Sequence, residues 1–301
     1  MKVLILGSTG FLGSYFGFAV PRLGHTVAGI SRRYVSYFPG NTVVNSLEDI
    51  STIIRSGGYE VVVNCVAMAS HELCEADPEN AELVNGTFPG IWAEAASQSG
   101  AHFVQISTDA VFDGNSRQLY AEEDDSNPIS KYGESKLFGE SSVLASDNSA
   151  LVVRTNFFGW SNKGQTGILD FFVKAQSARK PVTGFQDYSV SSIYMGHLVE
   201  AIFELLERNT SGLIHVASST VLSKYEFGVM VSEHLGYNSR NVKPGFITDQ
   251  NGMVRRGRDL GLASERAQQI LKHDLPSTAD GLRQAMAERQ DVLSYFAQIA
   301  K

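Results

Sequence analysis

The feature that most constrains this chain of 301 residues is a glycine-rich turn close to its start. The apolar run 3–6 is typical of a buried strand, and the sequence "GSTGFLG" follows it directly. Gly7 permits a tight turn, Gly10 lets the backbone approach an anionic ligand, and Gly13 lets the next helix pack close to the sheet. The turn therefore predicts a strand–turn–helix unit that binds the pyrophosphate of a dinucleotide at the helix N-terminus.

Strands and helices alternate through the first half of the chain. Apolar runs predict further strands at 25–31, 61–67, 102–108 and 150–156, and the segments between them predict helices at about 11–23, 78–100 and 130–145. Such alternation produces parallel strands with helices on both faces. We therefore predict an α/β fold built on a Rossmann-type, doubly wound parallel sheet.

The pattern loosens after Asn156, where helices are expected at 167–180, 197–208 and 223–236 and a strand at 212–218. We predict that residues 1–155 form the dinucleotide-binding domain, with a return excursion near 194–218. Residues 156–301 are then expected to form a smaller, mixed α/β lobe that binds substrate.

Composition excludes several classes of protein. A net charge of −7 disfavours a broad nucleic-acid footprint, and no segment approaches the roughly 20 apolar residues that span a bilayer. The glycines interrupt the N-terminal apolar stretch, which argues against a signal peptide. Two cysteines, Cys65 and Cys74, and scattered histidines predict neither a disulfide framework nor a metal site. We expect a cytoplasmic protein that binds neither membrane nor nucleic acid.

The end of the second predicted strand indicates which dinucleotide is bound. An acidic residue there would bind the ribose hydroxyls of NAD, but this chain has Ser31, Arg32 and Arg33. A hydroxyl and two guanidinium groups suit the additional 2′-phosphate of NADP. A solvated basic pair on the surface is the alternative interpretation.

The stretch "KYGESK" places Tyr132 and Lys136 one helical turn apart, on one face of a predicted helix. Acting through the ribose of a cofactor, Lys136 is expected to favour ionisation of the Tyr132 phenol. A tyrosine tuned in this way can protonate the oxygen of a ketone while hydride reaches its carbon. Ser107 and Thr108 end the preceding strand, where open α/β sheets bind ligands, and one of them can hydrogen-bond the same oxygen.

These motifs, in this order, resemble the extended short-chain dehydrogenase/reductase family. The wording "STDAVFDG" followed by "YAEEDDSNPISKYGESKLFGE" is similar to its dTDP-4-dehydrorhamnose reductase branch, as are "VRT", "GFQDYSVSS" and "RRGRDLGL" further along. The resemblance covers the whole chain. It implies NADPH-dependent reduction of the 4-keto group of a nucleotide-activated 6-deoxyhexose, in deoxysugar or polysaccharide synthesis.

The resemblance also assigns residues. It implies that the catalytic residues are Thr108, Tyr132 and Lys136. Besides Tyr132 and Lys136, the implied cofactor-binding residues are Gly7, Thr9, Gly10, Phe11, Leu12, Gly13, Ser31, Arg32, Arg33, Asn64, Cys65, Val66 and Ala67. The implied substrate-binding residues are Ser107, Thr108, Asp109, Tyr132, Phe157 and Arg256.

Two positions depart from the branch. Ala110 stands where the branch usually has an aromatic residue, and Phe157 stands where rhamnose-forming members tend to have tryptophan. Both leave the exact sugar and its stereochemistry open.

Several weaker signals carry two interpretations each. Glu72 and Glu75 lie near substrate or on a solvated face, and Arg154 is a ligand or a structural ion-pair residue. The three arginines of "VRRGRD" bind a diphosphate or cap a loop. His71 and His197 are expected to be surface or packing residues.

Two other functions stay open. An epimerase or dehydratase of the same fold usually binds NAD through an acid after the second strand, although Asp109 fits the spacing of a dehydratase acid. The regulatory subunit of methionine adenosyltransferase resembles the same branch and acts as a partner rather than an enzyme. The oligomeric state is also open, with a homodimer as one alternative.

Overall fold

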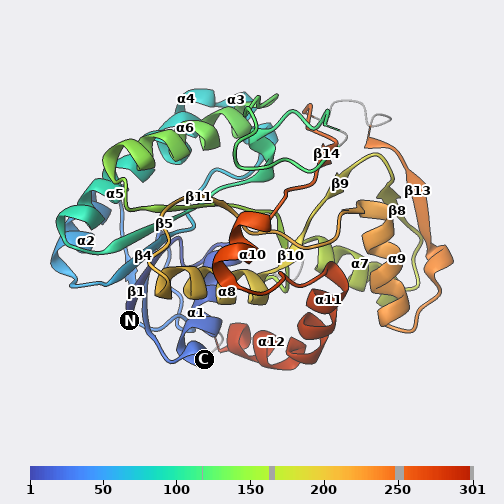
Figure 1. Cartoon of the computed structure of the whole chain (residues 1–301). Helices are drawn as coiled ribbons and strands as arrows, with labels where there is room; N and C mark the ends of the chain where they lie inside the picture. Colours follow the sequence, from blue (N-terminus) through green and yellow to red (C-terminus); the bar gives the residue numbers. More distant parts are fainter. Residues whose placement is uncertain (117, 163–166, 248–253, 299–301) are drawn as a thin grey trace.

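The structure, a computed structural model, describes residues 1–116, 118–162, 167–247 and 254–298, and a seven-stranded parallel sheet forms its centre (Figure 1). The strand order is β11-β6-β5-β4-β1-β2-β3, and every neighbouring pair is parallel. The order changes direction between β1 and β4, and open sheets bind ligands beyond the strand ends at such a point. The strands are β1 (Lys2–Leu6), β2 (Thr26–Ser31), β3 (Asn41–Val43), β4 (Val61–Asn64), β5 (His102–Ile106), β6 (Leu151–Arg154) and β11 (Gly212–His215).

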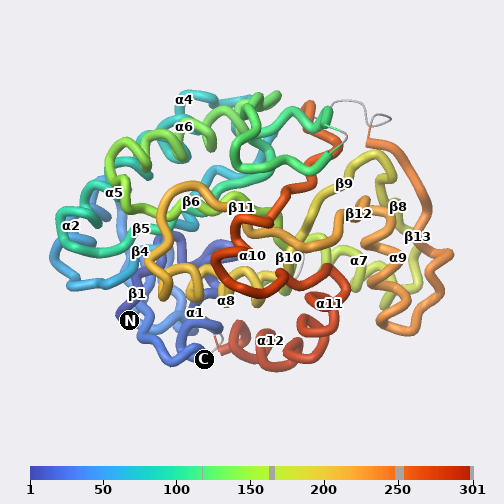
Figure 2. Tube along the Cα trace, viewed as in Figure 1, coloured from blue at the N-terminus to red at the C-terminus, as the bar shows by residue number. Residues whose placement is uncertain are grey.

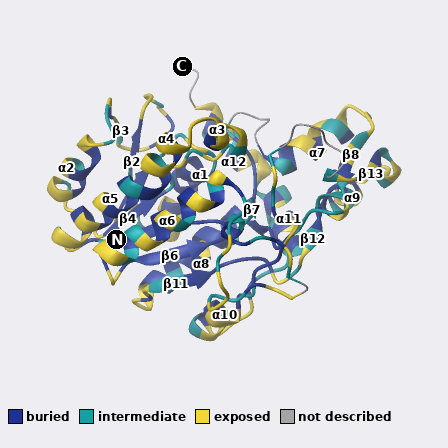
Figure 3. Ribbon diagram, turned by 90° about the horizontal axis from the view of Figure 1, so that it is seen from above, coloured by how far each residue is buried: buried dark blue, intermediate teal, exposed yellow. Residues whose placement is uncertain are grey.

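Both faces of the sheet are buried, which explains the continuous apolar strand sequences. In β1, Val3 and Ile5 pack into the core on one face, whereas Leu4 and Leu6 pack into the core on the other. Helices cover each face (Figures 1 and 3). The first layer contains α1 (Phe11–Ala19), α8 (Met195–Glu207) and α12 (Arg289–Ala297), and the second contains α2 (Asp49–Ser56), α5 (Phe88–Gln98) and α6 (Lys131–Ser146).

Two predicted helices differ in detail from the structure. The helix expected over 11–23 stops being α-helical at Ala19 and continues as a 3₁₀ turn, because Pro21 cannot donate a backbone hydrogen bond. The helix expected over 78–100 is divided into α4 (Pro78–Glu82), a π-helical turn (Leu83–Thr87) and α5.

The second half of the chain forms the smaller lobe and then returns to the sheet. In the lobe, β8 (Val182–Phe185) pairs with β13 (Val242–Gly245), and α7 (Ile168–Ser177) and α9 (Lys224–His234) pack beside them (Figure 2). The strand predicted near 212–218 is β11, which pairs with β6 at the sheet edge.

The remaining helices are α3 (His71–Ala76), α10 (Glu265–Leu271) and α11 (Thr278–Ala287), and the short strands are β7 (Phe157–Phe158), β9 (Ser189–Val190), β10 (Ile193–Tyr194), β12 (Leu222–Ser223) and β14 (Asp259–Leu260). The Rossmann-type sheet with a smaller mixed lobe is confirmed. The domain boundary at 155/156 stays a prediction. Among the described residues, none of the helices has both the length and the apolar character that crossing a membrane requires.

Candidate active site

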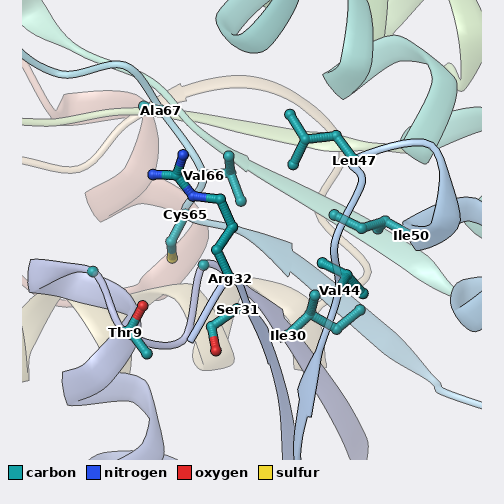
Figure 4. A pocket seen from close by; sticks show the side chains of 12 residues that line it. Thr9, Ile30, Ser31, Arg32, Val44, Leu47, Ile50, Cys65, Val66 and Ala67 are labelled. Atoms are coloured by element: carbon teal, nitrogen blue, oxygen red, sulfur yellow. The ribbon is translucent and has the colours of Figure 1, made fainter. Parts of the chain in front are cut away.

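A pocket of about 550 Å³ opens at the carboxyl edge of the sheet, where the order of strands changes direction. We call it the glycine-turn pocket. Figure 4 shows the Arg32 side chain leaving the end of β2 and extending across this pocket toward Val66. The lining residues are Gly7, Thr9, Gly10, Ile30, Ser31, Arg32, Val44, Leu47, Ile50, Cys65, Val66 and Ala67.

The glycines act as the sequence predicts. Gly7 has a φ of +82°, a conformation that L side chains rarely adopt. A Cβ atom on Gly13 would lie 2.2 Å from the carbonyl oxygen of Gly7, so no side chain fits under the turn. Gly10 precedes the first turn of α1, which contains no acidic residue to repel a phosphate.

Three of the predicted cofactor residues support the turn without lining its pocket. Leu12 is buried in the core, and Gly13 lies beneath the turn. The Phe11 ring packs against Phe157, with 5.7 Å between the ring centroids. These three residues pack around the turn, and none of them lines the glycine-turn pocket.

Two further predicted cofactor residues also lie outside the lining. The buried Asn64 amide donates to Gln105 over 2.8 Å, and its oxygen accepts the Val66 backbone N–H over 2.9 Å. Asn64 therefore shapes the segment after β4 through its hydrogen bonds. Arg33 is exposed and does not line the pocket, whereas its neighbour Arg32 does.

Sequence reasoning missed one wall of the glycine-turn pocket. Val44, Leu47 and Ile50 form an apolar surface after β3. Their only signal was an apolar residue every few positions in "NTVVNSLEDI", which is also typical of ordinary core.

A second pocket, of about 570 Å³, contains two of the predicted proton-delivery residues, Thr108 and Tyr132. We call it the reaction pocket. The segment after β4 joins the two sites, because Ala67 lines the first pocket and Ala69 lines the second. The reaction pocket is lined by Ala69, His71, Thr108, Asp109, Ala110, Ile129, Ser130, Tyr132, Asn156, Tyr188, Arg256, Gly257 and Leu260.

Tyr132 lies in the first turn of α6, which begins where the Ser130 side chain accepts the Gly133 backbone N–H. Burial raises the pKa of the Tyr132 phenol to about 12, against a lowering by its hydrogen bond with Thr108. The Lys136 ammonium instead donates to the carbonyl oxygen of Ile106 over 2.7 Å. The lowering of the Tyr132 pKa expected through a bound cofactor stays a prediction, since desolvation dominates in the protein chain by itself.

Burial likewise lowers the pKa of Lys136 to about 8, and the charge of Glu140 opposes this shift. Its ammonium lies one helical turn from Tyr132 on α6, as predicted. Lys136 is buried and lines neither pocket, so its action through the cofactor ribose stays a prediction.

Ser107 is a correction to the predicted substrate contacts. Its hydroxyl donates to the buried Glu140 carboxylate, and it does not line the reaction pocket. Arg154 makes a buried ion pair with the same carboxylate, with 2.7 Å between Nη2 and Oε2. Arg154 is therefore the structural ion-pair residue of the two interpretations, and Ser107 lies behind the site.

Phe157 packs against Phe11 and is not part of the reaction-pocket lining, so its predicted contact with substrate stays a prediction. Arg256 does line the reaction pocket, where its guanidinium is paired with Glu72. The other arginines of its segment separate from it, with Arg255 exposed and Arg258 lining a different pocket.

Glu75 accepts the backbone N–H of Lys131 at the start of α6 over 2.8 Å. This hydrogen bond satisfies a free donor in the first turn of that helix. Glu75 thus stabilises the helix that carries Tyr132.

His71, Asn156 and Tyr188 line the reaction pocket, and sequence reasoning did not identify them as site residues. The His71 ring lies 4.7 Å from the Tyr132 ring, and burial lowers the pKa of His71 to about 4. The imidazole is therefore neutral at neutral pH. No sequence signal distinguished His71 or Tyr188 from packing residues, since only the folded chain brings them to Tyr132.

Comparison with known proteins decides the family. The family model described as "RmlD substrate binding domain" matches residues 1–290. This chain belongs to that family. The predicted dTDP-4-dehydrorhamnose reductase-like branch of the extended short-chain dehydrogenase/reductases is thereby confirmed.

Relatives agree with this assignment. The chain is 29% identical to the "Probable low-salt glycan biosynthesis reductase Agl14" of Haloferax volcanii, over 98% of this chain and all of that protein. It is 27% identical to the dTDP-4-dehydrorhamnose reductase of Mycolicibacterium smegmatis, over 95% of this chain and 85% of that protein.

The fold is shared with the dTDP-4-dehydrorhamnose reductase of Bacillus anthracis solved in complex with NADP. The TM-score is 0.84 at 21% identity, covering 95% of this chain and 99% of that chain. Subunit beta of mouse methionine adenosyltransferase 2 is also similar, at 28% identity over 82% of this chain and 75% of that protein, so the regulatory alternative stays open.

Proposed function

We propose that this chain uses NADPH to reduce the 4-keto group of a nucleotide-activated 6-deoxyhexose. The observation that carries the proposal is the reaction pocket itself, in which Thr108 and Tyr132 lie together beside the glycine-turn pocket. Membership of a family whose relatives include sugar-nucleotide reductases supports the class of substrate.

The residues of the glycine-turn pocket fit NADP. The tight turn, which has no room for a side chain at Gly13, and the first turn of α1 without an acid suit a pyrophosphate. Arg32 offers its guanidinium to a 2′-phosphate, and no acidic side chain lines the pocket beside it. Bound NADPH would supply the hydride.

The proton comes from Tyr132 in this proposal. Since the pKa of its phenol is about 12, Tyr132 is protonated at neutral pH and acts as the acid. The phenol O–H bond breaks as a new O–H bond forms on the oxygen of the former ketone. Thr108, which hydrogen-bonds with Tyr132, orients the phenol toward that oxygen, and Lys136 would orient the cofactor ribose.

A panel of nucleotide 4-keto-6-deoxysugars tests the proposal, with loss of NADPH absorbance as the readout. We expect turnover with 4-keto sugars and none with the corresponding 4-hydroxy sugars. Tight NADPH binding without oxidation by any sugar would support a regulatory subunit and contradict the reductase.

A further inference from the structure

Lys224, the first residue of α9, lies in the wall of a third pocket of about 650 Å³. We call it the side pocket. Tyr188 and Arg256 line both the side pocket and the reaction pocket, so the two pockets adjoin. The side pocket is lined by Ile168, Phe171, Phe172, Thr183, Phe185, Tyr188, Lys224, Ile247 and Arg256.

Local structure does not explain a lysine at position 224. The N-terminal turn of a helix favours acidic residues, and Glu226 already forms a capping box with Ser223 there. The Lys224 side chain is partly buried and makes no hydrogen bond with any residue in the part of the chain that the structure describes. Its ammonium lies 5.2 Å from the centroid of the Tyr188 ring. The stability of α9 therefore does not explain the positive charge of Lys224.

Asp109 supplies the opposite charge. Burial raises the pKa of the Asp109 carboxyl to about 6, and the Lys224 ammonium is among the groups that oppose this shift. In return, burial lowers the pKa of Lys224 to about 8 and the Asp109 charge opposes that shift. The two side chains therefore stabilise each other's charged form from different pockets.

The hydrogen bonds of Asp109 show what its charge controls. Its Oδ1 accepts the Thr108 hydroxyl over 3.0 Å, and its Oδ2 accepts the Asn156 side-chain N–H over 2.8 Å. The Ser192 hydroxyl donates to the Asn156 oxygen and so fixes the orientation of that amide. Because Thr108 has one hydroxyl hydrogen, the charged Asp109 determines where it points.

We propose that Lys224 is a positioning residue of the reaction pocket. Its ammonium holds Asp109 as a carboxylate, and the carboxylate fixes the Thr108 hydroxyl beside Tyr132. A neutral Asp109 would be a weaker acceptor than the carboxylate and would bring a hydrogen of its own, so it would hold the Thr108 hydroxyl less firmly. The consequence for turnover rests on the proposed function, whereas the coupling between Lys224 and Asp109 does not.

The other ionisable groups that face Asp109 are neutral or are already paired with an acidic residue. The charge of Asp109 helps to raise the pKa values of Tyr132 and Tyr188, and both phenols are neutral near pH 7. His71 is neutral as well, and the Arg256 guanidinium on the same pocket wall is paired with Glu72. Lys224 is the cation that acts on the Asp109 carboxyl.

Infrared titration of the substrate-free protein tests the coupling directly. The carboxylic-acid C=O band of Asp109 is assigned by its loss in Asp109→Asn. Removal of a neighbouring positive charge disfavours the carboxylate, so Lys224→Met should raise the midpoint of this band by about one pH unit. Lys224→Arg, which keeps the charge, should leave the midpoint unchanged, as should Lys174→Met at an exposed site in the same lobe.

An unchanged midpoint in Lys224→Met would overturn the proposal, and so would an equal shift in Lys224→Arg. Thermal unfolding identifies variants that are misfolded, and Lys224→Gln then replaces the methionine variant. A protein that oxidises no NADPH but shows the infrared shift would refute the proposed function and keep the coupling.

The pH dependence of kcat/KM tests the positioning role. In Lys224→Met the acidic limb should move upward by the same amount as the infrared midpoint, because Asp109 is protonated at higher pH. Asp109→Asn should abolish that limb, and adding Lys224→Met to it should cause no further shift. A uniform loss of activity at every pH, without movement of the limb, would mean that Lys224 only binds substrate and would overturn the positioning role.

Discussion

The glycine-turn pocket and the reaction pocket are neighbours, but they are assembled in different ways. The residues that line the first all lie between positions 7 and 67, whereas those that line the second are drawn from positions 69 to 260. Backbone and small residues shape much of the first, and ionisable side chains with shifted pKa values shape the second. The difference indicates that binding is encoded locally and that chemistry depends on the whole fold. Substitutions in the two pockets should therefore fail in different ways.

The largest effect is expected in the reaction pocket, from Tyr132→Phe. This change removes the proton donor and keeps the ring that packs against His71. Turnover should fall by about 10²- to 10⁴-fold, the usual contribution of a general acid, while NADPH affinity is retained. Steady-state kinetics and fluorescence titration measure the two quantities. Tyr34→Phe, at an exposed site, is the control. Near-normal turnover in Tyr132→Phe would contradict the assignment of proton donation to the reaction pocket and of NADPH binding to the glycine-turn pocket.

The second prediction concerns the glycine-turn pocket. Arg32→Ala should weaken NADPH binding by about 10- to 100-fold and leave NADH binding nearly unchanged, since a charged hydrogen bond is lost. Arg33→Ala is the matched control, because Arg33 is exposed outside the pocket. Equal losses for the two cofactors would give Arg32 a structural role.

Gly13→Ala tests the same pocket through its backbone. The new Cβ would meet the Gly7 carbonyl oxygen at 2.2 Å, and overpacking of this kind costs about 1–3 kcal/mol. We expect a lower melting temperature together with weaker NADPH binding. Gly24→Asn, at a left-handed turn with open space around it, should change neither quantity. If Gly13→Ala changed neither the melting temperature nor NADPH binding, the pocket would not depend on the absence of a side chain at position 13.

The smallest expected effect is the absence of a Tyr132 titration in the neutral range of pH. Because burial raises the pKa of Tyr132 to about 12, the ultraviolet difference between wild type and Tyr132→Phe should show no phenolate below about pH 10. The phenol loses its acidic proton only above its own pKa, so the acid form is present throughout the neutral range. Phenolate appearing near pH 8 in the protein alone would contradict the dominant effect of burial on the pKa of Tyr132.

The features that could be predicted from the sequence are the local ones, as in the comparison of the two pockets. The sheet, the turn at Gly7 and the helix of Tyr132 follow from periodicity and glycine spacing, because these features are local. The split at the π-helical turn did not follow, since no strong local signal marks that geometry. Tertiary packing brings Tyr188 to the reaction pocket and Lys224 to the adjoining side pocket from the second half of the chain, and no spacing rule predicts such contacts.

Ser107 shows how a motif can mislead by one residue. Ser107 and Thr108 both carry a hydroxyl directly after β5, but successive side chains of an extended chain point in opposite directions. Thr108 faces the reaction pocket and Ser107 faces the buried Glu140. Only the partner on each side distinguishes the two hydroxyls.

Transfer of a deuterium label tests the central claim most directly. NADPH deuterated at the transferred position is incubated with the protein and a nucleotide 4-keto-6-deoxysugar, and the product is examined by NMR. The account predicts one deuterium at C4 of the product sugar, carried there next to the Tyr132 hydroxyl. A label found at C6, or a product sugar without label, would contradict it.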